Sequence, residues 1–297
     1  MRSTNLKRVT RLLLGFLLLI TIHAAVGQTH ALSKFSSSRI TDCTFHSKAL
    51  GRDMHYIIVL PQKYEDSQQR FPVLYLLHGW AGDYTNWVKL TKLTEYAERY
   101  SMIVVTPDAQ NSWYVNSFTA PGDRFEDYIV NDLIQEIDSR WRTMPSPGSR
   151  SIAGLSMGGY GSVLLALKHP GLFAVVASVS GAFIGPIGIE QVIPDVREST
   201  DRAYGPAGSA TRKDDDIYLL LAKAKRENIP YMFIECGSED SLLASNRKFV
   251  EQLSSGNVAY EYHEYPGGHT WEFWDHSLPM MLRVIAERIS ADQEKAR

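Results

Sequence analysis

The fold is decided by the stretch Ser151-Ile152-Ala153-Gly154-Leu155-Ser156-Met157-Gly158-Gly159. Its apolar start predicts a buried strand, and the residues after Ser156 predict a helix. The centre fits G-x-S-x-G, a pattern in which a strand turns sharply into a helix and holds a serine at the apex of a strained turn. Glycines flank the serine because a side chain there would collide with the turning backbone. The pattern predicts Ser156 as a nucleophile; the alternative is a strand-to-helix turn that merely contains a serine.

Strand-like and helix-like stretches alternate on both sides of this turn. Apolar or alternating runs predict strands at 40–45, 54–60, 73–77, 102–105, 151–153, 173–179, 231–235 and 258–265. Other stretches predict helices at 86–100, 125–141, 157–168, 217–226, 243–253 and 271–289. This order is typical of an α/β protein with a mostly parallel central sheet and helices on both faces.

The N-terminal residues differ in character from the rest of the chain. Several basic residues precede the apolar run 12–22, and small residues follow at 24–27. This three-part layout predicts a secretory signal peptide at 1–27. The apolar run is short for a bilayer span, although an uncleaved membrane anchor is the alternative. We therefore expect a secreted or periplasmic protein that begins near Gln28 and makes no stable membrane insertion after cleavage.

The amino-acid composition predicts one globular domain at 28–297. The chain of 297 residues is 44% hydrophobic and 22% charged, which is typical of a protein with a sizeable core. A net charge of -2 gives no general attraction to nucleic acid, so no nucleic-acid partner is expected. Residues 182–215 are rich in Gly, Pro and Asp, and such a long excursion is either a functional cap or a disordered insert. We expect a cap over the site.

A serine hydroxyl is a poor nucleophile and needs a neighbouring base. Four histidines follow Ser156 in the chain, and His269 is the one in a loop after the last predicted strand. The others lie at a helix end, in a strand and in the final helix (His169, His263, His276). Because ligands bind at the carboxyl ends of strands in open α/β sheets, the placement favours His269 as the base.

An acid is expected after the preceding parallel strand, where it would orient the imidazole and stabilise its charged form. Glu239 and Asp240 both qualify by position, and either could instead cap the following helix. We choose Asp240. The oxyanion donors are expected to be the backbone N–H groups of Trp80, in the loop after strand 73–77, and of Met157. His78, directly before Gly79 at the same strand end, is interpreted as a loop-shaping hydrogen-bond donor.

Together these pieces resemble the family of α/β-hydrolases described as Putative esterase. That family includes S-formylglutathione hydrolases, tributyrin-type esterases, feruloyl and acetyl-xylan esterases, and mycolyltransferases. The resemblance runs from about Asp53 to about Arg288. It is carried by Leu76-Leu77-His78-Gly79, Asn111-Ser112-Trp113-Tyr114, Phe125-Glu126-Asp127-Tyr128, Gly154-Leu155-Ser156-Met157-Gly158-Gly159, Gly237-Ser238-Glu239-Asp240 and Gly267-Gly268-His269-Thr270-Trp271.

The resemblance implies an α/β-hydrolase fold with a triad at Ser156, Asp240 and His269, and oxyanion donors at Trp80 and Met157. It implies no cofactor, and neither Cys43 nor Cys236 has a zinc-ligand spacing around it. In the fold's usual strand order Cys43 would lie far from Cys236. An intramolecular disulfide is therefore not expected.

The sequence predicts a secreted serine carboxylesterase that acts through an acyl-enzyme on small-molecule or polysaccharide-linked esters. Trp113, Tyr114, Trp271 and Trp274 are expected near the site, where they would stack on sugar or phenolic groups of feruloyl- or acetyl-type esters; ordinary core packing is the alternative. One rival is an acyltransferase of the mycolyltransferase type. Others are an S-formylglutathione hydrolase-like thioesterase, which the export signal disfavours, and a non-catalytic binding protein.

Overall fold

The computed structural model describes residues 39–295, with side chains described for residues 39–290. From Asp42 onward the described chain forms one compact unit. The expected signal peptide, residues 1–27, lies outside the described residues. Within the described part, no helix combines the length and the apolar character that a membrane span requires.

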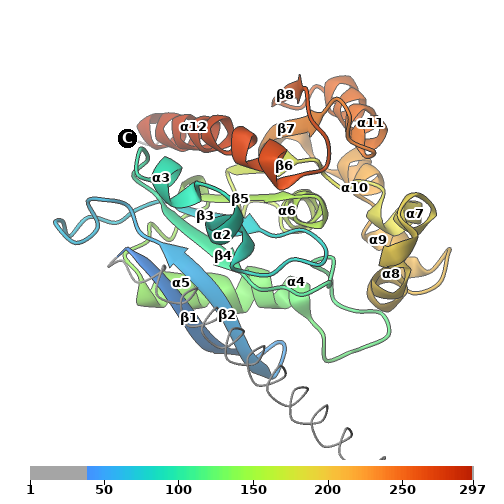
Figure 1. The fold of residues 1–297 in the computed structure, drawn as a ribbon, viewed down its shortest axis with the longest axis horizontal. Coiled ribbons are helices and arrows are strands. Elements are labelled where there is room, and N and C mark those ends of the chain that lie inside the picture. Colours follow the sequence, from blue (N-terminus) through green and yellow to red (C-terminus); the bar gives the residue numbers. More distant parts are fainter. Residues whose placement is uncertain (1–38, 296–297) are drawn as a thin grey trace, which may run out of the picture. The chain divides into compact units, whose positions relative to one another are not determined.

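One sheet of eight strands runs through the described chain, in the order β1-β2-β4-β3-β5-β6-β7-β8. β2 pairs antiparallel with β4, and every pairing from β4 through β8 is parallel (Figure 1). The strands are β1 (Ile40–Ser47), β2 (Arg52–Val59), β3 (Val73–Leu77), β4 (Ile103–Pro107), β5 (Arg150–Leu155), β6 (Val175–Val179), β7 (Tyr231–Gly237) and β8 (Tyr260–Tyr265). Every residue of β3, β4, β5 and β6 is buried, as expected for parallel strands covered on both faces.

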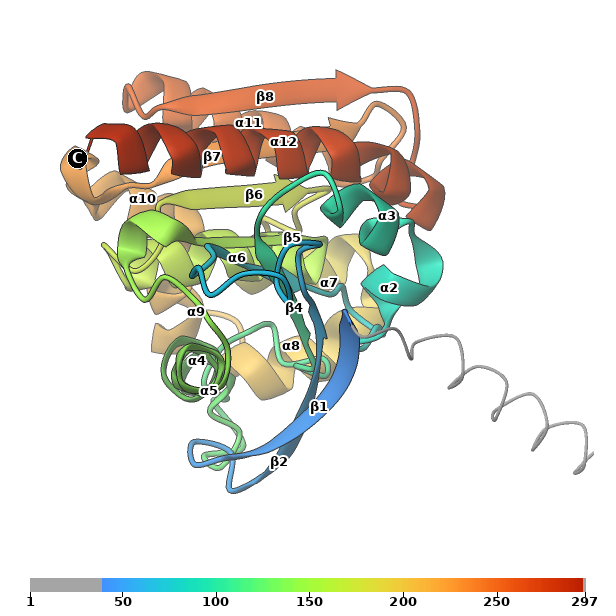
Figure 2. The same cartoon turned by 90° about the vertical axis from the view of Figure 1, so that its left-hand side faces the viewer.

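Helices cover both faces of this sheet. α12 packs on α3, β6 and β7, while α6 packs on β5, β6 and α10; Figure 2 shows α12 in front of the strands and α6 behind them. The long helices are α6 (Met157–Lys168), α11 (Leu243–Ser255) and α12 (Trp271–Lys295). The shorter ones are α2 (Asn86–Leu90), α3 (Leu93–Ala97), α4 (Phe125–Asp127), the π-helix η1 (Tyr128–Leu133), α5 (Ile134–Arg140), η2 (Pro147–Ser149), α7 (Gly185–Val192), η3 (Pro194–Val196), α8 (Arg197–Tyr204), α9 (Ala210–Asp214), α10 (Ile217–Lys223) and η4 (Arg226–Asn228).

The predicted fold class is confirmed, and each predicted strand is present with ends shifted by a few residues. The helix predicted at 86–100 is wrong as a single element, because the chain breaks it into α2 and α3. Thr91 is extended at φ -135° and ψ 174°, its hydroxyl donates to the Trp87 carbonyl, and the Leu93 N–H donates to that hydroxyl. A threonine side chain that bonds neighbouring backbone in this way competes with the helix.

Residues 182–215 fold into α7, η3, α8 and α9. The buried guanidinium of Arg212 ties these helices together, since it donates to the Glu190 carboxylate at 3.1 Å and to the backbone carbonyls of Pro186 and Gly205. A buried cation needs such a full set of partners to be tolerated. The segment is therefore an ordered helical insertion after β6.

The two cysteines lie on strands far apart in the sheet order, Cys43 on β1 and Cys236 on β7. Because β1 is first and β7 seventh in the sheet order, the two side chains are not placed to bond to each other. Burial raises the pKa of both thiols above the usual range. Buried thiols of this kind are chemically inert.

Candidate active site

Ser156 occupies the turn between β5 and α6 in a strained conformation, with φ +52° and ψ -117°. A non-glycine residue adopts such angles only when its surroundings hold it there. Three backbone hydrogen bonds do so: the Ser156 N–H donates to Val179, and the Ser156 carbonyl accepts from Tyr160 and Ala182, each at 3.0 Å. The serine is thus fixed to β6, to α6 and to the residues after β6.

The flanking glycines are required by space. A Cβ at Gly154 would lie 2.5 Å from the carbonyl carbon of Gly158. A Cβ at Gly158 would lie 2.6 Å from the carbonyl oxygens of Leu77 and His78. Because Cβ atoms do not approach backbone this closely, α6 can begin directly against β3 and β5 only with glycine at these positions.

The structure brings the Ser156, His269 and Asp240 side chains together. His269 Nε2 lies 3.0 Å from Ser156 Oγ, and His269 Nδ1 lies 2.9 Å from Asp240 Oδ2. Ser156 follows β5, Asp240 follows β7 and His269 follows β8, so all three lie at carboxyl ends of parallel strands. Since the carboxylate only accepts, Nδ1–H donates to Asp240 and Nε2 is left to accept the serine proton.

The environment of Asp240 keeps its carboxyl ionised. Its side chain has no solvent exposure, and its second oxygen accepts the Leu242 N–H at 2.8 Å. Burial alone raises the pKa of Asp240, but the hydrogen bonds from His269 and Leu242 outweigh it and hold that pKa below its usual range. Glu239, by contrast, is exposed, and its carboxylate has no partner among the described residues. The geometry therefore selects Asp240 over Glu239 as the partner of His269.

His78 shapes the loop after β3. Its ring is 1% exposed, with Nδ1 lying 2.8 Å from the Gly79 carbonyl and Nε2 3.0 Å from the Ala109 nitrogen. Because the Ala109 N–H can only donate, Nε2 accepts it and Nδ1–H donates to Gly79. The imidazole is fully used in holding the loop, as predicted, and is not available as a base.

This loop also runs past the serine. A Cβ at Gly79 would lie 3.4 Å from the Ser156 Cβ, so the loop backbone passes close to the nucleophile. Within residues 39–295, the N–H groups of Trp80 and Met157 form no hydrogen bond. Met157 is the first residue of α6, where the helix dipole adds positive potential. In the same range, no group of three His, Cys, Asp or Glu side chains is placed to hold a metal ion.

Ser156 and His269 line a cavity of about 240 Å³, here called the inner cavity. Its other walls are mostly apolar side chains, and the insertion 182–215 contributes Ile189, Ile193 and Val196 to them. The volume is at or below the small end of typical ligand pockets. The inner cavity therefore suits a short apolar group.

Of the aromatic residues predicted near the site, Trp113, Trp271 and Trp274 line the inner cavity. Trp113 and Trp274 are buried, as the core-packing alternative expects, whereas Trp271 is partly exposed. The prediction for Tyr114 is wrong. Tyr114 is fully buried and absent from the cavity wall, and its hydroxyl donates to the His78 carbonyl at 2.9 Å. The backbone is left-handed at both Trp113 and Tyr114. The Trp113 ring lines the inner cavity, whereas the neighbouring Tyr114 ring supports the loop before Trp80.

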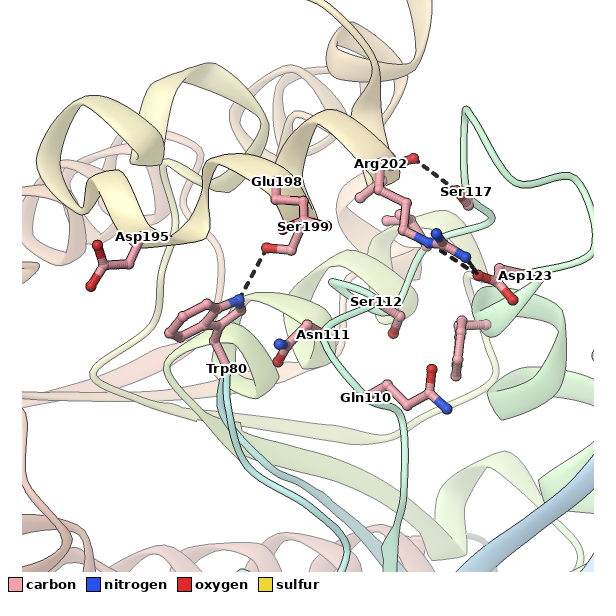
Figure 3. A pocket seen from close by; sticks show the side chains of 13 residues that line it. Trp80, Gln110, Asn111, Ser112, Ser117, Asp123, Asp195, Glu198, Ser199 and Arg202 are labelled. Atoms are coloured by element: carbon pink, nitrogen blue, oxygen red, sulfur yellow. Dashed lines mark hydrogen bonds and ion pairs between the residues drawn. The ribbon is translucent and has the colours of Figure 1, made fainter.

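Ser199 on α8 is a site residue that sequence reasoning missed. Its hydroxyl accepts the indole N–H of Trp80 at 3.0 Å (Figure 3). The same hydroxyl accepts the indole N–H of Trp113 at 3.0 Å and donates to the Val196 carbonyl at 2.8 Å. It thereby fixes two aromatic walls to the insertion. The partners are 119 and 86 residues away in sequence, and no local pattern signals such contacts.

The parallel sheet, the strained serine and its histidine and aspartate partners define a serine hydrolase of the α/β-hydrolase fold. The chain belongs to the family described as Putative esterase, whose model matches residues 47–285. It is 32% identical over 80% of its length to an acetyl esterase of Caldicellulosiruptor saccharolyticus, and covers 94% of that protein.

Two solved Staphylococcus aureus structures are each 28% identical to the chain over 84% of its length and 98% of theirs. One is the fluorophosphonate-binding serine hydrolase F, with a TM-score of 0.74. The other is an S-formylglutathione hydrolase, with a TM-score of 0.73. The chain is accordingly a carboxylic ester hydrolase.

Proposed function

We propose that this protein is a secreted serine carboxylesterase that cleaves short acyl esters through an acyl-enzyme on Ser156. The observation that carries the proposal is the continuous contact chain from Ser156 Oγ through His269 to Asp240, at 3.0 and 2.9 Å. A base within hydrogen-bond reach of the nucleophile, itself oriented by a buried carboxylate, is the arrangement that activates a serine hydroxyl.

The reaction proceeds in two acyl-transfer steps. Ser156 Oγ attacks the ester carbonyl carbon while His269 Nε2 takes the hydroxyl proton, and the Trp80 and Met157 N–H groups hold the oxyanion. The C–O bond to the alcohol then breaks, and His269 gives its proton to the leaving oxygen. Water attacks the acyl-enzyme, His269 takes and returns a second proton, and the free acid leaves with Ser156 restored.

The acyl group is expected to be short, of the acetyl type, with feruloyl esters as the larger candidates. The small, apolar inner cavity supports this size. The relative from Caldicellulosiruptor saccharolyticus carries the name acetyl esterase. Trp271, which is partly exposed in the cavity wall, offers a ring surface to the phenolic or carbohydrate part of a substrate. The export signal expected at 1–27 supports substrates that lie outside the cytoplasm.

The test is a panel of acetyl, butyryl and feruloyl esters, with a thioester included, measured on the wild type and on Ser156→Ala. We expect the acetyl ester to be hydrolysed best and Ser156→Ala to lower kcat by several orders of magnitude. Ser139→Ala, an exposed serine on α5, is the matched control. Near-normal ester hydrolysis by Ser156→Ala would reject the assignment, and a preference for the thioester would favour an S-formylglutathione hydrolase-like activity.

Acyl transfer to an alcohol is the second candidate, because a further cavity borders the inner one at Trp80 and could hold an acceptor. In that reaction a hydroxyl replaces water in the second step, with the same proton transfers through His269. Product analysis with added sugar acceptors separates the two. A transferase yields mainly acylated acceptor, whereas an esterase yields mainly free acid.

A further inference from the structure

Ser180, the first residue after β6, is a buried serine with a left-handed backbone, at φ +52°. Its N–H donates to the Glu235 carbonyl on β7 at 2.8 Å, which holds the backbone in place. Glycine adopts this conformation without strain, whereas serine does not. Strain of this kind gathers at functional sites, which points to a use for the Ser180 side chain.

The Ser180 hydroxyl holds the indole of Trp274 on α12. Trp274 Nε1–H donates to Ser180 Oγ at 3.2 Å. The same indole makes a T-shaped contact with the His269 imidazole, with ring centroids 4.9 Å apart and planes at 89°. The indole therefore limits how far the imidazole can tilt, and Ser180 fixes the indole.

The same hydroxyl also bonds to the Asp240 carboxylate. Because the indole N–H can only donate, Ser180 Oγ accepts from Trp274 and gives its own proton to Asp240. The two carboxylate oxygens already accept from His269 and from the Leu242 N–H, and they have room for a third donor. Burial raises the pKa of Asp240. Hydrogen bonds from His269, Leu242 and Ser180 outweigh burial and hold that pKa below its usual range.

Cys236 and Glu235 are titratable neighbours of Ser180. The Cys236 thiol lies against the Ser180 hydroxyl, and burial raises the pKa of this thiol well above its usual range, so it stays neutral. A carboxylate is a stronger acceptor than a neutral thiol, which directs the Ser180 proton to Asp240. The Glu235 carboxyl accepts from Ser277 on α12. Both neighbours stay in place when only Ser180 is changed.

We infer that Ser180 is a positioning residue for the reaction, because its one hydroxyl joins both supports of the His269 ring. One support is the Trp274 indole, and the other is the Asp240 carboxylate. The inference rests on the proposed function, in which His269 is the base for Ser156. Without the hydroxyl the two supports are no longer bonded to a common atom, so His269 Nε2 spends less time in line with Ser156 Oγ.

The first experiment compares Ser180→Ala and Ser180→Gly with the wild type. Both variants remove the hydroxyl, whereas only glycine also relieves the left-handed strain, so Ser180→Gly should unfold at the higher temperature of the two. Both should hydrolyse p-nitrophenyl acetate with a kcat about tenfold lower, because a small displacement of a catalytic group costs rate steeply. Ser178→Ala is the matched control and should keep kcat. Ser178 is a buried serine of β6 whose hydroxyl has no partner among the described residues.

The pH profile of kcat/KM separates positioning from a merely structural role. Without the Ser180 donor, the pKa of Asp240 rises and its carboxylate becomes a stronger acceptor for the protonated His269. The imidazolium then keeps its proton to higher pH, so the acidic limb of the profile should move up by about half a pH unit in both Ser180 variants. Trp274→Phe removes only the indole N–H, so it should lower kcat about threefold and leave that limb in place.

The outcomes for the inference and for the proposed function can be told apart. Loss of hydrolysis in Ser156→Ala upholds the proposed function, whatever the Ser180 variants do. The inference needs both the lower kcat and the moved acidic limb, and a folded Ser180→Gly that lacks either change would overturn it. An equal loss of kcat in Ser178→Ala would overturn it too. If neither Ser180 variant folds, Trp274→Phe decides, and wild-type kcat in that variant would overturn the inference.

Discussion

Replacing Asp240 with asparagine keeps the shape of the site but removes the negative charge and turns one of the two acceptor oxygens into an NH₂ donor. Asparagine can still accept the Leu242 N–H, which Asp240 Oδ1 accepts at 2.8 Å. Its NH₂ group then faces His269 Nδ1, and two donors oppose each other unless the imidazole proton moves to Nε2. A protonated Nε2 cannot accept from Ser156 Oγ, so the base is lost.

The magnitude follows from these contacts. The variant loses both the correct tautomer and the negative charge that stabilises the imidazolium, which together cost about 10³–10⁴-fold in kcat, or roughly 4–5 kcal/mol. Turning the amide around restores the histidine contact but leaves the buried Leu242 N–H without an acceptor, at a cost of about 1–3 kcal/mol. KM should change little, because the Asp240 side chain has no solvent exposure and does not line the inner cavity.

The assay is steady-state hydrolysis of p-nitrophenyl acetate, with thermal unfolding measured on the same samples to show that the variant is folded. Glu239→Gln is the matched control, because its carboxylate is one residue away, exposed and unpaired among the described residues. The control should keep kcat within about twofold, as surface substitutions generally do. A folded Asp240→Asn with full activity, or an equal loss in Glu239→Gln, would refute the reasoning.

Three further predictions concern stability. Gly158→Ala should lower the free energy of unfolding, measured in urea titrations, by at least about 1–3 kcal/mol, because the added Cβ would meet two carbonyl oxygens at 2.6 Å. Gly148→Ala is the control and should be near neutral, because nothing lies within 4 Å of its added Cβ. Burial raises the pKa of Glu235 above its ordinary value of 4.5. At a pH between 4.5 and the raised pKa, the folded protein therefore keeps a proton on Glu235 that the unfolded chain has lost. Wild-type stability should therefore fall relative to Glu235→Gln as the pH rises, and a pH-independent difference would contradict this. Ser199→Ala should cost about 1–3 kcal/mol by leaving the buried indole N–H of Trp113 without an acceptor; an unchanged melting temperature would argue against that bond.

The fold and the central contacts were predictable from sequence because they depend on local patterns. Buried apolar runs marked the strands, and the glycines around Ser156 marked the one turn that needs them. The rule that sites gather at carboxyl ends of parallel strands then selected His269 and the Glu239-Asp240 pair. Position alone left Glu239 and Asp240 open, and the family resemblance favoured Asp240. The structure supplies the physical reason, because burial of one carboxylate and exposure of its neighbour depend on how the chain after β7 packs.

Contacts between distant segments could not be predicted in this way. Ser199 looks like any helical serine in the sequence, yet its hydroxyl holds two indoles from loops about a hundred residues away. Tyr114 follows Trp113 directly, and nothing local shows that one ring lines the cavity while the other supports a loop. The cavity that borders the inner cavity at Trp80 likewise arises where the insertion meets the segment after β4, and its walls come together only in the folded chain.

The central claim is that Ser156 is the nucleophile, and covalent labelling tests it most directly. A fluorophosphonate loses fluoride as the activated serine oxygen bonds to phosphorus, so the modified residue can be found by peptide mass spectrometry. The account predicts one adduct per chain, on the peptide that contains Ser156, with loss of esterase activity in step with labelling. An adduct on a different residue would contradict it. An enzyme that stays unlabelled and fully active after prolonged treatment would contradict it as well.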